Sequence, residues 1–162
     1  MTNRPQPVSV QSPFLQFTLA CTFMDARLAL KRVRAKLERV GIGKKDVDRV
    51  EIVLAEVLNN IVEHAHAEEP AQVTIIRSPN KLNIVVLDNG GPMPDGDLPC
   101  GQLAEYAIEQ DPLPEGGFGW FLIRDLANEL EYSRREGKNH LSFVINLNTE
   151  APASCQPAAK SP

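Results

Sequence analysis

The sequence lacks the features of several common classes of protein. Its three cysteines are odd in number and form no CxxC pair, so neither a disulfide scaffold nor a zinc site is predicted and a reducing cytoplasm is expected. No apolar run reaches about 18 residues and the N-terminus has no hydrophobic signal segment, so we expect no membrane span and no signal peptide. Lysine and arginine form no long block and the net charge is −4, which argues against direct binding of nucleic acid.

The composition is that of one globular domain with a tail at each end. Apolar residues make up 43% of the 162 residues, and a chain of this length can bury a sizeable core. Residues 1–12 and 149–162 are rich in Pro, Ala, Ser and Gln and have little to bury, so they are predicted to be disordered. The folded domain is therefore expected to span residues 13–148.

Hydrophobic periodicity predicts the main elements. Alternation indicates a strand at 14–20, and apolar residues at helical spacing indicate helices at 24–39 and from Asp46 onward. Two hairpins follow, the first built from AQVTIIRS and KLNIVVLD and the second from ELEYSRR and HLSFVINL, with a helix at 119–128 before the second. This order differs from the alternation of a doubly wound parallel sheet. It predicts an α+β fold, a two-layer sandwich with helices packed on one face of a mostly antiparallel sheet.

The segment AEVLNNIVEHAH, residues 55–66, contains the first candidate site. Glu56, Asn60 and His64 are spaced four residues apart and should lie along one face of a helix. A carboxylate and an amide oxygen suit Mg²⁺, which keeps several waters and takes further ligands from phosphates. Polar residues on a solvated helix face have the same spacing, so this second interpretation stays open. His64 and His66 would point to different sides of the helix, which argues against a metal site between them.

The segment DNGGP, residues 88–92, follows a predicted buried strand. Asp88 at the strand end could accept hydrogen bonds from an amino group of a ligand. Gly90 and Gly91 would let the backbone approach that ligand closely. An ordinary turn is the alternative, because Asp-Asn-Gly is a common turn sequence.

The segment EGGFGWFLI, residues 115–123, places Gly116, Gly117 and Gly119 at the start of a predicted helix. Backbone N–H groups at such a position can converge on an anion. No Gly-Lys-Ser/Thr follows, so this is not a Walker P-loop, and no strand directly precedes it, so it is not a Rossmann fingerprint. A flexible lead-in to an ordinary core helix is the alternative interpretation.

Taken in order, ExxxNxxxH, DxGxP and GGxGxxL are far more specific than any one of them. They resemble the N, G1 and G2 boxes of the GHKL ATPase superfamily. The chain is most similar to the anti-sigma regulatory factor branch, small serine-protein kinases that control bacterial sigma factors. The resemblance covers roughly residues 14–147 and implies the GHKL (Bergerat) ATP-binding fold, with ATP and Mg²⁺ as cofactors.

The resemblance implies a role for each residue that matches the N and G2 boxes. Asn60 corresponds to the asparagine that coordinates the Mg²⁺ ion, and Glu56 to the acid that acts as general base toward an attacking hydroxyl. His64 falls where this branch often has a histidine that lines the nucleotide pocket. Gly117 and Gly119 match glycines that wrap the phosphates.

The G1 box and the last strand complete the implied site. Asp88 matches the aspartate that receives the adenine amino group, and Gly90 the glycine beneath the purine. The second G1 glycine of many members is Pro92 here, so one backbone N–H is absent. Ser142 in HLSF is similar to a Thr or Ser that supports the edge of the adenine.

The resemblance implies an ATP-dependent kinase that is also a binding switch in the bacterial cytoplasm. It would phosphorylate a STAS-type anti-anti-sigma protein and sequester a sigma factor. A module that binds ATP, or nothing, without chemistry is the main alternative, and a generic ATPase subunit is a third. A homodimer is expected from the family, and the loop from about Asp95 to Glu115 is predicted to be a mobile lid that ATP orders.

Overall fold

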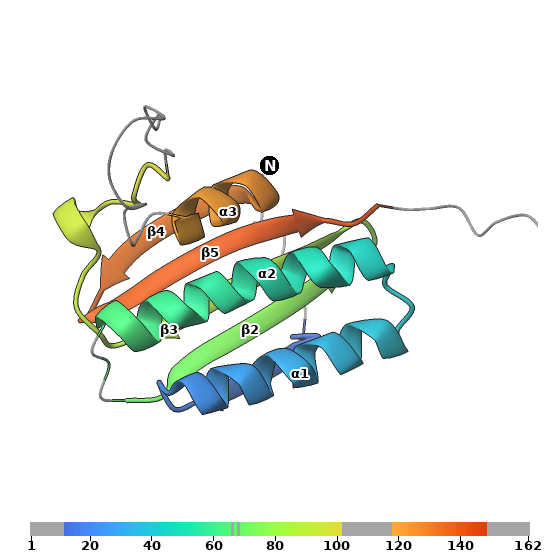
Figure 1. Cartoon of the computed structure of the whole chain (residues 1–162), viewed down its shortest axis with the longest axis horizontal. Helices are drawn as coiled ribbons and strands as arrows, with labels where there is room; N and C mark the ends of the chain where they lie inside the picture. Colours follow the sequence, from blue (N-terminus) through green and yellow to red (C-terminus); the bar gives the residue numbers. More distant parts are fainter. Residues whose placement is uncertain (1–11, 66, 68, 102–117, 149–162) are drawn as a thin grey trace, which may run out of the picture.

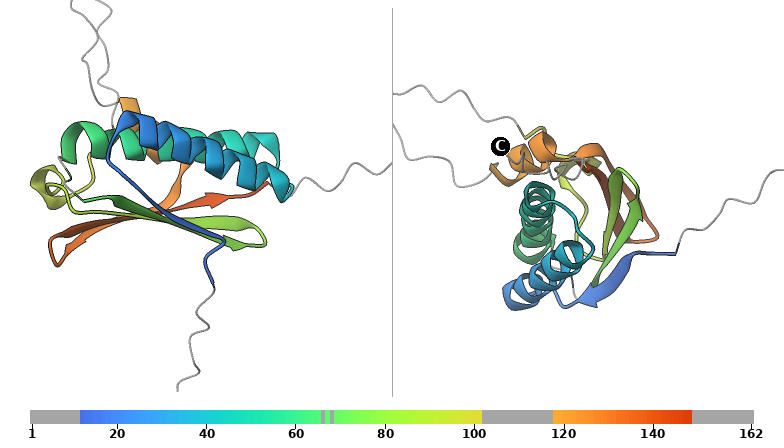
Figure 2. Two further views of the ribbon diagram at one scale, coloured as in Figure 1. Left: turned by 90° about the horizontal axis from the view of Figure 1, so that it is seen from below. Right: turned by 90° about the vertical axis from the view of Figure 1, so that its right-hand side faces the viewer.

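In the part of the chain that the computed structural model describes, residues 12–65, 67, 69–101 and 118–148, three α-helices cover one face of a five-stranded sheet (Figures 1 and 2). The strand order is β1-β2-β3-β5-β4, and every neighbouring pair is antiparallel. The predicted α+β two-layer sandwich is therefore confirmed. The end-on view in Figure 2 shows α1, α2 and α3 side by side on the same face.

Two long helices form the centre of the helical layer. Helix α1 spans Phe23–Arg39, and the Thr22 side chain caps it by accepting a hydrogen bond from the Asp25 amide (3.1 Å). Helix α2 spans Lys44–Asn60 and continues into a π-helical turn, η1, over Ile61–Ala65. The apolar stripe of α2 that the sequence predicts is buried: Val47, Val50, Val53, Leu54, Val57 and Leu58.

The sheet is formed by two hairpins and an N-terminal edge strand. Strand β1 spans Leu15–Leu19, β2 Ala71–Ser78 and β3 Lys81–Asp88. Helix α3 at Phe118–Leu126 precedes the second hairpin, in which β4 spans Asn128–Arg135 and β5 spans Lys138–Asn146. Alternate residues of β3 are buried against the helices, so Asp88 at the strand end faces the helical layer.

A buried acid ties the start of α2 to the ends of α3 and β5. Helix α2 begins two residues before the predicted start at Asp46: Gly43 is its N-cap, and Asp46 lies in its first turn. Asp46 is 2% exposed and accepts hydrogen bonds from the backbone amide (2.8 Å) and the side chain (3.1 Å) of Asn148. Arg49, one turn later, donates to the carbonyl oxygens of Leu126 (3.0 Å) and Asn146 (2.9 Å). These bonds fix the end of α3 relative to α2.

An ion cluster joins α1 to α2 at the surface. Arg34 of α1 donates to Asp48 (2.6 Å) and to Glu51 of α2, and to Glu38 (3.1 Å) of its own helix. Arg34 and then Lys44 lower the pKa of the Asp48 carboxyl by donating hydrogen bonds to it. The cluster therefore favours the charged form of Asp48 in the folded protein.

Several predictions concern residues outside the described ranges. They concern residues 1–11 and 149–162 of the two predicted tails and most of the proposed lid loop. They also concern four single residues: His66, Gly116, Gly117 and Cys155. The described beginning of the loop, residues 89–101, contains a short 3₁₀ turn, η2, at Pro94–Gly96. None of the helices that the structure describes is both long and apolar enough to cross a membrane.

Candidate functional site

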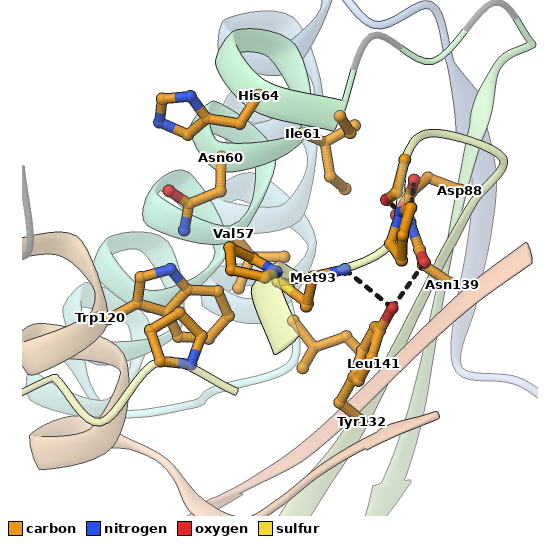
Figure 3. Close-up of a pocket in the computed structure, with 15 residues that line it drawn as sticks. Val57, Asn60, Ile61, His64, Asp88, Met93, Trp120, Tyr132, Asn139 and Leu141 are labelled. Carbon is orange, nitrogen blue, oxygen red and sulfur yellow. Dashed lines mark hydrogen bonds between the residues drawn. The ribbon is translucent and has the colours of Figure 1, made fainter. Parts of the chain in front are cut away.

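A cavity of about 210 Å³ opens between the helical layer and one end of the sheet (Figure 3). Helix α2 and η1 form one side, and the segment after β3 forms another. Helix α3 and the second hairpin complete it. The lining residues are Val57, Asn60, Ile61, His64, Ala65, Asp88, Gly91, Pro92, Met93, Pro94, Pro99, Trp120, Tyr132, Asn139 and Leu141.

Asp88 lines this cavity and has one carboxylate oxygen that the described residues leave without a hydrogen bond. Its side chain is 8% exposed, and Oδ1 accepts hydrogen bonds from the Gly90 amide (2.8 Å) and from Asn139 Nδ2 (2.8 Å). Among the described residues, no hydrogen bond reaches Oδ2. Burial raises the pKa of the nearby Cys21 thiol, and the negative charge of Asp88 contributes to that rise. Because Oδ2 has no partner among the described residues, Asp88 can accept a hydrogen bond from a donor group in the cavity.

Asn139 of β5 orients Asp88. It is 4% exposed, and its Nδ2 also donates to the Gly91 carbonyl oxygen (2.8 Å). Its Oδ1 accepts from the Tyr132 hydroxyl (2.8 Å) and from Arg134 (2.6 Å). Only this orientation of the amide pairs each donor with an acceptor. Asn139 is therefore the centre of a saturated polar network beside Asp88.

The same network holds the segment after β3. The Tyr132 hydroxyl accepts a hydrogen bond from the Met93 amide (3.1 Å), and Figure 3 shows this chain of bonds running from Met93 through Tyr132 to Asn139. Arg134 donates to the Gly90 carbonyl oxygen (2.8 Å). The backbone from Gly90 to Met93 is thus fixed by the β4–β5 hairpin.

Only glycine fits at position 90, because the backbone there lies directly against η1. A Cβ atom at Gly90 would overlap the Cβ and the carbonyl oxygen of Ala65, whereas a Cβ at Gly91 would lie 3.9 Å from that oxygen. The Gly91 amide donates to the Ala65 carbonyl (2.7 Å). The two glycines therefore differ: Gly90 permits the close approach, and Gly91 makes the hydrogen bond.

Asn60 and His64 both line the cavity, one on α2 and one on η1. Asn60 Nδ2 is buried without a hydrogen-bond partner in the described structure. His64 is exposed at the rim. The described residues contain no cluster of three His, Cys, Asp or Glu side chains, so protein ligands alone do not form a cation site. The donor set fits Mg²⁺ bound through one amide oxygen, with waters and phosphates as the remaining ligands.

Glu56 lies one turn before Asn60, away from the lining residues of the cavity and against α3. A Cβ atom at Gly119 would lie 2.6 Å from Glu56 Oε2, so the carboxylate packs directly on that glycine. The carboxylate therefore lies beside the first turn of α3, where the sequence predicts phosphate binding. Of the three residues predicted to share one helix face, Asn60 and His64 line the cavity and Glu56 does not.

Pro92 lines the cavity as expected, but the structure does not bring Ser142 to it. Side chains alternate along β5, and the buried residues Asn139, Leu141 and Phe143 face the helices. Ser142 lies between them in sequence and projects from the other face of the sheet. Asn139 instead provides the polar support of Asp88. The strands predicted for the second hairpin, 129–135 and 140–147, leave Asn139 in the turn between them, so its contact with Asp88 was not predicted.

Comparison with known proteins identifies the family of this chain. A family model described as "Histidine kinase-like ATPase domain" matches residues 20–145. The chain belongs to this family. The resemblance to the GHKL ATPase superfamily is thus confirmed.

Curated relatives named "Serine-protein kinase RsbW", from Bacillus cereus and Bacillus anthracis, are 31% identical over 103 residues. The match covers 61% of this chain and 64% of each relative, so the chain spans less than two thirds of their length. These names agree with the resemblance to the anti-sigma regulatory factor branch.

A crystal structure of the RsbU and RsbW domains of a Mycobacterium tuberculosis protein has a similar fold. Its TM-score is 0.60 at 18% sequence identity, and the similarity covers 82% of this chain and 32% of that one. At this identity the likeness supports the fold alone.

Proposed function

We propose that this chain is an ATP-dependent serine-protein kinase that acts as an anti-sigma factor. Its substrate would be a STAS-type anti-anti-sigma protein, and its second partner a sigma factor in the bacterial cytoplasm. One observation carries the nucleotide site: buried Asp88 lines a cavity that Asn60 also lines, and its Oδ1 accepts two protein hydrogen bonds while its Oδ2 accepts none from the described residues. Membership of the histidine kinase-like ATPase family and similarity to RsbW proteins support the kinase.

Adenine is the base that this pocket suits. Asp88 Oδ2 can accept a hydrogen bond from the 6-amino group of adenine, whereas guanine presents a carbonyl oxygen at that position. A carboxylate left opposite a carbonyl oxygen would be buried without a donor, which is costly. Gly90, Gly91 and Pro92 would border the purine, and Asn139 would keep Asp88 in position.

Asn60 would hold Mg²⁺ through its side-chain oxygen at the phosphate end. The bound ion would neutralise phosphate charge during in-line transfer. Gly119 lies in the first turn of α3, where backbone N–H groups are available to anions. Glu56, packed on Gly119, would accept the proton of the attacking serine or threonine hydroxyl at Oε2. Gly116 and Gly117 would contribute further N–H groups.

A module that binds ATP without transferring phosphate is the second candidate. The position of Glu56 favours it, because its carboxylate packs on α3 and is not among the residues that line the cavity. In this case the bound ATP would only control how the chain binds its partner protein.

Incubation with γ-labelled ATP, Mg²⁺ and a STAS-type protein separates the two candidates. The kinase transfers label to the STAS protein, Glu56→Ala abolishes transfer with ATP affinity within a few-fold of the parent, and Asn60→Ala loses Mg²⁺-dependent binding. Lys45→Ala, an exposed position at the opposite end of α2 from Asn60, is the control and should retain transfer. Binding without transfer by the parent chain would support the second candidate.

A homodimer remains a proposal based on the family. Strand β1 pairs with β2 on one side and is an edge of the sheet, so its other side could pair with a second chain. Light scattering at micromolar concentration tests this. A monomeric mass with and without ATP would remove the dimer from the account.

A further inference from the structure

The described start of the loop after β3 is fixed to helix α3 by a single arginine. Arg124 Nε donates a hydrogen bond to the Pro99 carbonyl oxygen (2.8 Å), and one terminal nitrogen donates to the Leu98 carbonyl oxygen (3.3 Å). The guanidinium is planar and carries donors in a fixed fork, so it suits two successive carbonyl groups. Arg124 is exposed, so these contacts hold the segment and do not bury the arginine.

Gly101 completes this attachment. It has a positive φ of 63°, and a Cβ atom there would lie 2.9 Å from the Trp120 carbonyl oxygen and 3.0 Å from Arg124 Cδ. The backbone of the segment therefore lies directly on α3 at a point where only glycine fits. Trp120 and Arg124 are four residues apart on α3, so they share the face that the segment covers.

The contacts of residues 98–101 with α3 determine which residues form one wall of the cavity. Pro99 and Trp120 both line the cavity, and Figure 3 shows Trp120 across the cavity from Asp88 and Asn139. The two hydrogen bonds from Arg124 hold the backbone of Leu98 and Pro99 on α3, the helix that carries Trp120. An indole ring such as that of Trp120 can stack on a nucleobase, and such stacking contributes on the order of a tenfold change in affinity or more.

We propose that Arg124 is a positioning residue of this pocket: it holds residues 98–101 on α3 so that Pro99 and Trp120 form a wall against which the nucleoside of ATP packs. This inference rests on the proposed nucleotide site. It adds to that site a residue, Arg124, that is not among the residues matched to the N, G1 and G2 boxes. It also assigns Trp120 a direct contact with the ligand.

The chain carries its own reporter for this wall, because Trp120 is its only tryptophan. Saturating Mg·ATP should change the intensity or wavelength of its emission in the parent chain. Without nucleotide, Arg124→Gln should expose Trp120 to acrylamide more than in the parent. Arg135→Gln, which removes an exposed arginine of β4 remote from α3, is the matched control and should quench like the parent.

Calorimetry then measures the effect on binding. Arg124→Gln and Gly101→Ala should each weaken Mg·ATP binding about tenfold. Arg124→Lys keeps one donor and should remain within about threefold of the parent. Thermal unfolding of Arg124→Gln should match that of Arg135→Gln, because a positioning role changes the pocket and not the stability of the fold.

The outcomes separate this inference from the proposed function. A parent chain that binds no Mg·ATP overturns both. A parent that binds Mg·ATP with no change in Trp120 emission, or Arg124→Gln and Gly101→Ala chains that bind like the parent, overturn the inference alone. If both variants fail to fold, Arg124 and Gly101 are structural and the positioning role is wrong.

Discussion

Replacing Asn139 by Asp tests the polar network beside Asp88 with almost no change of shape. In the parent, Asn139 Nδ2 donates to Asp88 Oδ1 and to the Gly91 carbonyl oxygen, both at 2.8 Å. Asn139→Asp replaces this donor by a carboxylate oxygen that faces two acceptors. The bonds from Tyr132 and Arg134 to Oδ1 can remain.

The expected magnitude follows from these contacts. Two carboxylates about 3 Å apart repel by about 5 kcal/mol at an effective dielectric constant of about 20, before any relaxation. The unpaired Gly91 carbonyl oxygen adds about 1–3 kcal/mol, and the charge of Arg134 offsets part of the total. We expect Asn139→Asp to lower the free energy of unfolding by about 3 kcal/mol at about pH 7.

The loss should depend on pH. Two adjacent carboxylates bind one shared proton more tightly when folded than when unfolded. The variant therefore regains stability as the pH falls from about 7 to about 5, and the difference from the parent shrinks. Urea unfolding at both pH values measures this. Asn80→Asp, at an exposed position in the turn between β2 and β3, is the control and should change little. A loss below about 1 kcal/mol, or one that is equal at both pH values, would refute the reasoning.

Two further predictions concern stability. Gly90→Ala should lower the free energy of unfolding by about 2–4 kcal/mol, because its Cβ would overlap the backbone of Ala65, whereas Gly91→Ala has room and should cost far less. Equal losses in urea unfolding would contradict the close approach of Gly90 to η1. Asp48→Asn should lower the melting temperature near neutral pH, because Arg34 lowers the pKa of the Asp48 carboxyl and so stabilises the folded state above the unfolded pKa. The deficit should vanish as the pH falls below about 4 and should shrink in about 1 M salt, and a deficit that is unchanged by both would show that the ion cluster does not cause it.

The helices and hairpins could be predicted because their patterns are local. The apolar residues of α2 repeat at helical spacing and are buried in the structure. The first hairpin was predicted with the strands that the structure has, Ala71–Ser78 and Lys81–Asp88. Small shifts at helix ends, such as α3 ending at Leu126 and not at residue 128, reflect capping contacts that come from elsewhere in the chain.

The network around Asp88 could not be predicted so well, because it depends on strand register. The segment EGKN has the composition of a turn, which placed Asn139 in the loop of the second hairpin. In the structure the turn is confined to two residues, Glu136 and Gly137, and β5 begins at Lys138, so Asn139 pairs with Asp88. Counting back from the buried residues Leu141 and Phe143 by twos would have placed Asn139 on the helix-facing side and Ser142 on the other.

The position of Glu56 and the wall of the cavity also depend on tertiary contacts. No local pattern signals η1, which alters the spacing after Asn60. The contact of Gly119 with Glu56 and the bonds of Arg124 to Leu98 and Pro99 join segments that are far apart in the sequence. Motif spacing identified Glu56 and Gly119 but not their contact, and it gave no sign of the role of Arg124.

The central claim is that the cavity binds adenine through Asp88. Isothermal titration calorimetry of the full chain with Mg·ATP and Mg·GTP tests it most directly, together with the variant Asp88→Asn. We predict binding of Mg·ATP, at least about tenfold weaker binding of Mg·GTP, and a loss of at least about tenfold for ATP in Asp88→Asn. Equal affinity for the two nucleotides, or unchanged ATP affinity in Asp88→Asn, would contradict it.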